Sequence, residues 1–309
     1  MTKQRNLKSI ILIIPYFGKW PVWINFFMES CRRNPTVNWI FYTDCGVPEN
    51  LPPNVSINTM SYRDYTQLVS SRLNVDFKPT DPYKLNDIKS MYGVIHRSDI
   101  SGFDFWGHCD IDMVFGNIRS IYSSDILENY DVISSHEHFV SGHFALFRNN
   151  WKMRNFFRFI KHWRSIVEDT RYRNFDELEA GRFFGFPNRP RGVWKFVPRV
   201  LNPFRRRCLF KEQYSTPFIN ITWLDGRKNH PDVWFWQNGI VTNAGDGDRQ
   251  FLYFHFMTYK HSQMSTREPT VKGKAPWELL DQIVQIDWRL AAAEGFQIGP
   301  QGIRALPKN

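Results

Sequence analysis

The chain has 309 residues and a formal net charge of +10, and 42% of its residues are hydrophobic, enough for a full core in one large domain or in one domain with an extension. Its best apolar run, Ile10–Ile14, ends at Pro15, which excludes a membrane span of ~20 residues and is too short for a secretory signal. The cysteines form neither a CxxC pair nor a disulfide-rich pattern (Cys31, Cys45, Cys109 and Cys208). We therefore expect a cytoplasmic protein with reduced thiols.

Predicted strands and helices alternate in the first half of the chain. β-Branched residues closed by Pro and Gly predict a buried strand over 9–18, and the next segment predicts an amphipathic helix that stops at Asn34-Pro35. Further strands are expected at 38–45, 55–62, 103–112 and 130–135, and further helices at 62–73 and 83–100. This alternation indicates an α/β fold with a largely parallel sheet, in which ligands gather where the strands end.

The second half of the chain has a different order of elements. We expect a helix over 150–168, a β-hairpin over 232–243 that turns at Asn238-Gly239, a strand over 250–259 and an amphipathic helix over 275–293. Residues 189–211 hold eight basic and no acidic residues among aromatic and aliphatic ones, and three prolines oppose a long helix there. This composition is typical of a segment that lies on anionic lipid. A solvated loop and a nucleic-acid-binding segment are the alternatives, although no nucleic-acid-binding signature accompanies it.

Two acids, Asp110 and Asp112, stand one residue apart in the aromatic stretch "DFWGHCDIDMVFGNI" (104–118). In an extended strand, residues i and i+2 point the same way, so the two carboxylates would crowd together while Ile111 and Met113 face the core. Two like charges about 4 Å apart repel by roughly 1 kcal/mol in water and by about 4 kcal/mol at an effective dielectric of 20. The pair therefore predicts a cation between the carboxylates.

An Asp-x-Asp pair at a strand end has two main uses in an α/β fold. It holds Mn²⁺ or Mg²⁺ against the diphosphate of a nucleotide-sugar, or it supplies the nucleophile and acid of an aspartate-based phosphatase. The phosphatase interpretation expects the pair after the first long aliphatic strand, whereas this pair lies mid-chain behind "FWGHC". An accidental pair is the third alternative.

Six stretches occur in a fixed order: "IIPYFGKWP", "FYTDC", "YKLNDIKSMYG", "FWGHCDIDMVFGNI", "SGHFALFRN" and "FLYFHFMTYK". Together they resemble the GT-A-fold glycosyltransferases of bacterial surface-polysaccharide clusters, especially a group of capsule and O-antigen proteins without an assigned activity. The likeness covers about residues 9–260 and is absent from the basic block and the tail. It implies a Rossmann-like, mostly parallel central sheet with flanking helices, a C-terminal β-hairpin and a helical extension. The domains implied are 1–260, including the basic insertion 189–211, and 261–309.

The resemblance implies a metal site and a donor site, residue by residue. Asp110 and Asp112 match the metal motif and His255 matches a further ligand of Mn²⁺ or Mg²⁺, with imidazole better suited to Mn²⁺. The implied donor-side residues lie in the loops after the first two strands, in the helix over 83–100 and in the metal motif (Tyr16, Phe17, Gly18, Asp44, Lys84, Asp87, Lys89 and Asp110). The alternatives are a turn residue for Asp44, a core histidine for His255, and solvated helix charges for Lys84 and Lys89.

The resemblance also implies an acceptor side. The loop of Ser141, Gly142 and His143 matches a glycine-bearing acceptor loop, where close approach of the backbone favours Gly. Asp176 and Glu177 in "NFDELEA" resemble the acidic pair that serves as general base in inverting members, and helix capping by Asp176 is the alternative. The other candidate bases are near the acceptor loop (Glu137, His138 and His143), and the remaining histidines show no HExxH spacing.

These expectations combine into a metal-dependent glycosyltransferase. It would move a sugar from a UDP-linked donor, with UDP-galactose as the first candidate, to a lipid-linked polysaccharide in capsule or O-antigen synthesis, with inversion. It would work at the inner face of the bacterial membrane, touch anionic lipid through 189–211 and bind no nucleic acid. The alternatives are a metal-dependent phosphohydrolase and a non-enzymatic basic protein that binds membranes or nucleic acid.

Overall fold

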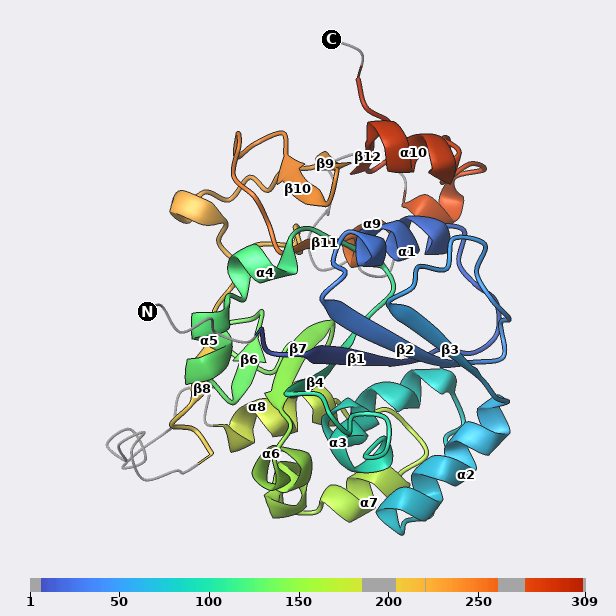
Figure 1. The fold of residues 1–309 in the computed structure, drawn as a ribbon, viewed down its shortest axis with the longest axis vertical. Helices are drawn as coiled ribbons and strands as arrows, with labels where there is room; N and C mark the ends of the chain where they lie inside the picture. The colour runs from blue at the N-terminus through green and yellow to red at the C-terminus, as the bar shows by residue number, and fades with distance from the viewer. Residues whose placement is uncertain (1–6, 185–203, 220, 261–275, 308–309) are drawn as a thin grey trace.

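A seven-stranded sheet forms the centre of the fold in the computed structural model, which describes residues 7–184, 204–219, 221–260 and 276–307. Its strand order is β3-β2-β1-β4-β7-β6-β8, and of these strands only β7 runs in the opposite direction (Figure 1). This sheet confirms the predicted α/β class and largely parallel pairing. Its strands are β1 (Ile10–Pro15), β2 (Val37–Thr43), β3 (Val55–Thr59), β4 (Phe105–Cys109), β6 (Val132–Ser134), β7 (Phe144–Arg148) and β8 (Cys208–Phe210).

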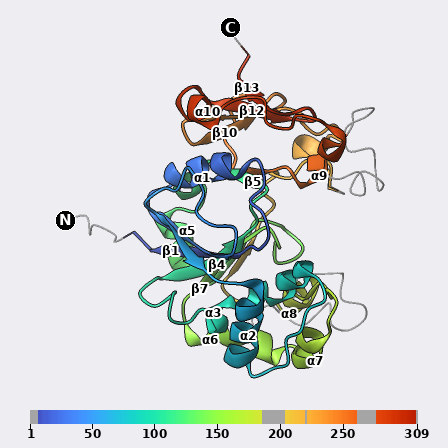
Figure 2. The same ribbon diagram turned by 90° about the vertical axis from the view of Figure 1, so that its right-hand side faces the viewer.

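Helices cover both faces of this sheet (Figures 1 and 2). Successive residues of β1 point to opposite faces, so that Ile11 and Ile13 enter one core and Ile10 and Leu12 the other. The first core is covered by α2 (Tyr62–Leu73), η1 (Pro82–Met91), α3 (Tyr92–Ile95), α6 (Trp151–Asn155), η2 (Phe156–Phe159), α7 (Trp163–Glu168), η3 (Phe175–Glu179) and α8 (Ala180–Phe183). The second is covered by α1 (Ile24–Arg32), α4 (Ile118–Ile121) and α5 (Ser124–Asn129).

Two smaller sheets complete the fold. A four-stranded sheet of order β10-β9-β12-β13 lies beyond α1 (Figure 2), where Phe26 packs on Phe296 with 5.0 Å between ring centroids. β5 (Met113–Phe115) pairs with β11 (Tyr253–His255) just after the Asp-x-Asp loop, and this pairing brings the C-terminal part of the chain to that loop. The remaining elements are η6 (Leu224–Gly226), β9 (Trp234–Gln237), β10 (Ile240–Asn243), α9 (Met257–Lys260), η8 (Trp277–Leu279), α10 (Trp288–Glu294), β12 (Phe296–Gly299) and β13 (Gly302–Ala305).

The predicted hairpin over 232–243 is confirmed, because β9 and β10 pair around Asn238 and Gly239, whose φ angles are 51° and 78°. The predicted helix over 275–293 is wrong as one element. The segment around Val284 forms a bridge to Ile303 of β13, which keeps it extended, and the helix begins only at α10. The predicted boundary at residue 260 separates β9 from β12, although these strands pair in one sheet.

Three other elements differ from their predictions. The helix expected over 83–100 is mostly a 3-10 helix, and the helix expected over 150–168 is broken after η2, where Ile160 is extended and His162 has a φ of 62°. Adjacent Phe156 and Phe157 are both buried there. The strand expected over 103–112 ends at Cys109, so Asp110 and Asp112 lie in a loop.

The basic segment 189–211 lies outside the described residues up to position 203. Its described remainder includes the edge strand β8, which pairs with β6. Among the residues that the structure describes, no helix combines the length and the apolar character that crossing a membrane requires.

The centre of β4 generates a stability prediction. A Cβ at Gly107 would overlap the carbonyl oxygen of Ala145 on β7, so Gly107→Ala should force the two strands apart and destabilise the protein by about 1–3 kcal/mol. Urea unfolding measures this change. Gly245→Ala is the matched control, because the nearest atom to its Cβ is 3.5 Å away, and it should shift the free energy of unfolding by less than about 0.5 kcal/mol. Equal effects of the two substitutions would contradict the close strand contact.

Candidate active site

A cleft of about 1560 Å³ opens at the carboxyl edge of the central sheet. The loop after β1 contributes Tyr16 and the loop after β4 contributes Asp110, while the loop from β6 to β7 contributes Gly142. These loops lie together because β1, β4 and β6 run in the same direction. Glu177 of η3 and His255 of β11 also line the cleft.

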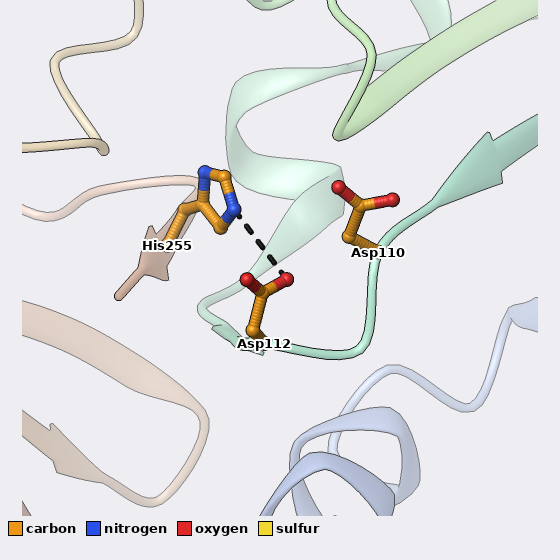
Figure 3. A group of neighbouring side chains, drawn as sticks. All are labelled: Asp110, Asp112 and His255. Atoms are coloured by element: carbon orange, nitrogen blue, oxygen red, sulfur yellow. Dashed lines mark ion pairs between the residues drawn. The ribbon is translucent and has the colours of Figure 1, made fainter. Parts of the chain in front are cut away.

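Asp110, Asp112 and His255 form a cluster in which one ligand atom of each residue lies within 4.8 Å of the others. Figure 3 shows that the two acids come from one loop and the histidine from the neighbouring strand β11. The indole of Trp23 donates a hydrogen bond to the carbonyl of Ile111 over 3.0 Å, which fixes the middle of that loop. Two carboxylates and an imidazole are ligands that suit a divalent metal ion.

The environment of His255 fits a metal ligand. Its Nε2 is buried, has no hydrogen-bond partner among the described residues, and lies 3.4 Å from Oδ1 of Asp112. Its Nδ1 lies 3.2 Å from the hydroxyl oxygen of Thr216, which can accept a hydrogen bond from a protonated Nδ1. In that tautomer the Nε2 lone pair is left for a cation. A buried polar atom without a partner is costly, and a metal ion at this position would satisfy it. The cluster can therefore hold a divalent metal ion.

Two lysines balance the two acids. Lys89 Nζ lies 2.6 Å from Oδ1 of Asp110, and Lys260 Nζ lies 2.5 Å from Oδ2 of Asp112. Burial raises the pKa of Asp112, but Lys260 and His255 outweigh burial and hold this pKa well below its usual range. Asp112 is therefore a carboxylate at neutral pH, as a metal ligand must be.

A second acidic group, Asp176 and Glu177, lies on the other side of Lys89. Asp176 is only 2% exposed, and burial raises its pKa to about 8, with Lys89 opposing and Glu177 adding to the shift. Burial also raises the pKa of Glu177, and Lys89 and a hydrogen bond from the Gly142 amide oppose this. Burial thus favours the protonated form of both carboxyls, and Asp176 keeps its proton at neutral pH.

Gly142 leaves room for this acidic pair. Its amide donates to Oε1 of Glu177 over 3.2 Å, and its carbonyl accepts from Lys89 over 2.8 Å. A Cβ at this position would lie 2.6 Å from Oε1 of Glu177 and 3.1 Å from Oδ2 of Asp176. The structure therefore gives a physical reason for glycine in the "SGH" loop, namely the close approach of both acids. Asp176 does not cap its helix, because the cap position is Asn174 and the Asp176 carboxylate accepts from the hydroxyl of Tyr172.

Lys84 and Asp87, which were predicted to contact the donor, lie in the interior of the protein. Lys84 Nζ donates to Oδ2 of Asp87 over 2.8 Å and to two backbone carbonyls, those of Ile166 and Arg171. Asp87 in turn accepts the amides of Arg173 and Phe175 over 2.8 and 2.7 Å. Both side chains are buried and neither belongs to the described lining of the cleft. Their prediction as donor contacts is corrected, because all three ammonium hydrogens are used inside the protein. They hold the loop that precedes the acidic pair.

The predicted donor-side loops meet each other. The amide of Gly18, whose φ is 109°, donates to Oδ1 of Asp44 over 2.7 Å. Tyr16 and Phe17 line the cleft, whereas Gly18 and Asp44 are not among its described lining residues. Asp44 thus connects the ends of β1 and β2, and a direct contact of Asp44 with a ligand stays a prediction.

Of the predicted acceptor residues, His143 lines the cleft, but the Ser141 side chain is turned inward. The Ser141 hydroxyl accepts the amide of Phe144 over 3.3 Å, and its residue is fully buried. His143 Nε2 contacts the hydroxyl of Tyr253 over 2.7 Å, and that hydroxyl donates to Ser135, which donates to the Phe144 carbonyl. Since a carbonyl can only accept, the chain of hydrogen bonds places the His143 proton on Nε2 and leaves Nδ1 as an acceptor.

Several residues of the site have no recognisable signal in the sequence. Tyr172 contacts a predicted site residue but stands in no motif, and Lys260 ends the stretch "FLYFHFMTYK" without a predicted role. Thr216, which contacts His255, lies in a segment without predicted structure. Of the other candidate bases, Glu137 and His138 are exposed in the turn after β6, and His138 also lines the cleft. Only the tertiary fold brings these residues together.

Comparisons with known proteins give one family match and distant structural likenesses. A family model described as a family of unknown function (DUF6625) matches residues 12–278. A search of curated proteins found no match.

Three solved structures are similar over part of the chain. A galactosyltransferase, LgtC, in complex with donor and acceptor sugar analogues is 9% identical with a TM-score of 0.36, covering 67% of this chain and 75% of that chain. Mouse xyloside xylosyltransferase 1 in its apo form is 9% identical with a TM-score of 0.32, covering 52% and 72%. The glycosyltransferase GlyE of Streptococcus pneumoniae TIGR4 is 11% identical with a TM-score of 0.30, covering 53% and 41%.

The metal cluster generates a binding prediction. Asp112→Asn should weaken Mn²⁺ binding by at least about tenfold, because it removes a charged ligand and leaves Lys260 without its carboxylate. Isothermal titration calorimetry of metal-free protein measures the dissociation constant. Asp64→Asn, an exposed acid of α2 outside the cleft, is the control and should bind Mn²⁺ as the wild type does. If a folded Asp112→Asn variant bound Mn²⁺ with the affinity of the wild type, the cluster would not be the metal site.

The raised pKa of Asp176 generates a prediction about stability and pH. Because the folded state holds this proton up to about pH 8, the stability that the group contributes is complete below its ordinary pKa of 3.8 and is lost as pH rises through 8. Asp176→Asn cannot ionise, so its stability relative to wild type should increase between pH 5 and pH 8, by at most roughly 1.4 kcal/mol per pH unit. Urea unfolding in the presence of a chelator tests this, and parallel pH profiles for the two proteins would contradict the raised pKa.

Proposed function

The chain belongs to the family of unknown function DUF6625, and we propose that it is a metal-dependent glycosyltransferase with a GT-A fold. One observation carries the proposal: a cluster that can hold a divalent metal faces a buried acidic pair across Lys89, in one cleft at the carboxyl edge of a mostly parallel sheet. Metal-dependent transfer of a sugar with inversion uses both groups, one beside the leaving diphosphate and one beside the acceptor hydroxyl.

The metal side of the cleft suits a diphosphate. A divalent ion held by Asp110, Asp112 and His255 would neutralise the charge that develops on the leaving group. Lys260 adds a cation at this side, where it lies 2.5 Å from Asp112. Tyr16 and Phe17 offer aromatic surface in the same cleft, which fits the base of a nucleotide. We assign the donor as UDP-linked, with UDP-galactose as the first candidate, and Mn²⁺ as the preferred metal because of the imidazole ligand.

The acidic side of the cleft suits removal of a proton from an acceptor hydroxyl. Asp176 keeps its proton near neutral pH, which leaves Glu177 as the member of the pair that acts as base. Glu177 is the better placed of the two, since it is less buried than Asp176 and lines the cleft beside Gly142. A base opposite the leaving group favours a single displacement, which inverts the configuration of the sugar. His143 Nδ1 is an additional acceptor that can orient the hydroxyl.

The acceptor and the place of action complete the proposal. We assign the acceptor as a lipid-linked oligosaccharide or polysaccharide of capsule or O-antigen synthesis, at the inner face of the bacterial cell membrane. This assignment rests on the ordered motifs and on the basic composition of 189–211. The division into a transferase domain, 1–260, and a C-terminal extension, 261–309, belongs to the same proposal.

The activity test uses a panel of UDP-sugars with Mn²⁺ and a lipid-linked acceptor extract. The wild type should release UDP, Asp112→Ala should abolish release, and Glu177→Gln should lower kcat by about 10²–10⁴-fold, as expected for loss of a general base. A coupled assay for UDP measures the rates. Lys78→Ala, which changes an exposed lysine outside the cleft, is the control. Phosphate release from simple phosphoesters without a sugar acceptor would instead indicate a phosphohydrolase. If the folded protein turned over none of the nucleotide-sugars, the proposal would be overturned.

A further inference from the structure

We propose that residues 151–164 and 204–207 form a surface that binds an anionic lipid bilayer. This surface, the basic aromatic face, consists of α6, η2, the start of α7 and the four residues Phe204 to Arg207. Figures 1 and 2 show α6 and α7 on the side of the central sheet that is opposite the four-stranded sheet. The proposal deepens the proposed function, because it assigns the membrane contact to a defined surface. The role of this contact in catalysis rests on the proposed function, whereas the binding itself does not.

The charge of the face has one sign. Residues 151–167 contain five basic residues and no acidic one, and Arg205, Arg206 and Arg207 follow in the second segment. Acidic neighbours partly offset two of these charges, because Arg164 lies 3.7 Å from Glu168 and Arg207 lies 3.1 Å from Asp131. Arg158 and Lys161 are exposed and form no ion pair with the described residues. Clusters of this size attract the negative surface of a membrane that contains acidic lipids.

Two large aromatic side chains stand out into solvent between these cations. Trp151 is 64% exposed and Phe159 is 55% exposed, although the rest of the segment buries Met153, Phe156 and Phe157 in the core. Among the described residues, Tyr83 is the one other aromatic side chain with comparable exposure, and it lines the cleft. Exposed Trp and Phe beside Lys and Arg are what an interfacial membrane contact requires, because the rings enter the boundary of the acyl chains while the cations stay at the headgroups.

The two segments form one continuous surface. The ring of Phe204 lies 5.2 Å from that of Phe159, and Lys152 Nζ lies 5.4 Å from the centroid of Phe204. Phe204 therefore joins the start of α6 to the end of η2. It also belongs to the predicted lipid-binding segment 189–211, which links that prediction to a described part of the fold.

The face is also connected to the acidic side of the cleft. Lys84 Nζ donates to the carbonyl of Ile166 in α7 over 2.7 Å and to that of Arg171 over 2.9 Å, and Arg171 precedes the acidic pair by five residues. Lys84 therefore ties the end of α7 to the loop that leads to the proposed base.

A bilayer fits the face better than a nucleic acid. A duplex would meet the cations with its phosphates but would leave Trp151 and Phe159 in water, since phosphate contacts need no aromatic partner. A bilayer uses both kinds of side chain. Lipid is therefore the assigned partner, and nucleic acid is an outcome of the test.

Vesicle co-sedimentation with the full chain tests the proposal. The wild type should bind vesicles of phosphatidylcholine with 30% phosphatidylglycerol at about 0.1 M salt and should not bind pure phosphatidylcholine. The charge-reversal variant Arg158→Glu/Lys161→Glu and the aromatic variant Trp151→Ser/Phe159→Ser should each weaken binding by about tenfold or more. Matched controls are Lys228→Glu/Arg249→Glu and Val47→Ser/Leu290→Ser, which change exposed residues elsewhere and should bind as the wild type does.

Each result has a defined meaning. Circular dichroism confirms that the variants are folded. Wild-type affinity in both face variants, absence of wild-type binding to phosphatidylglycerol vesicles, or tighter binding to a DNA or RNA oligonucleotide would overturn the proposal. Vesicle binding does not depend on catalysis, so a protein that binds these vesicles through the face but releases no UDP would refute the transferase and leave the face intact.

Discussion

The buried ammonium of Lys89 is the interaction on which the arrangement of the cleft depends. It lies 2.6 Å from Asp110 and 2.8 Å from the carbonyl of Gly142, whose amide holds Glu177. Burial lowers the pKa of Lys89, but Asp110 and Asp176 outweigh burial and raise it, so the lysine stays charged. A buried cation is tolerated only where anions surround it, and here the anions belong to two different groups. One lysine therefore lets a metal-binding cluster and an acidic pair lie close together without mutual repulsion.

The main features of the fold follow from short local patterns. A β-branched run that ends at Pro15 predicts a buried strand, and an Asn238-Gly239 step between apolar runs predicts a hairpin. Both predictions are confirmed, because each local pattern strongly favours one backbone conformation. The errors occur where tertiary contacts override the local pattern. Residues around Val284 have helical periodicity but pair with β13, and the strand β7 lies inside the stretch "SGHFALFRN" without an alternating pattern, since it is buried on both faces.

The residues of the candidate site are predictable where their chemistry requires a short sequence motif. Asp110 and Asp112 form a recognisable Asp-x-Asp motif, and the ordered motifs indicate His255 as a further ligand. The structure places these three residues together. Tyr172 stands in no motif, and Lys260 stands in one that does not reveal its role, because its contact with Asp112 joins distant segments of the chain. A charged residue in a motif also does not reveal whether it faces a ligand or the interior.

The buried pair of Lys84 and Asp87 illustrates this last point and explains how the acidic pair is held. Asp87 accepts two backbone amides, those of Arg173 and Phe175, so the chain must turn around one carboxylate just before Asp176. The turn needs Asn174 in the left-handed region, with a φ of 56°, which an asparagine tolerates better than most residues. Lys84 neutralises Asp87 and ties α7 to the same loop. The position of the proposed base is thus set by an ion pair that does not line the cleft. In η1, Lys84 and Asp87 hold the loop before Asp176, and Lys89 supplies the charge that balances the two acidic groups of the cleft.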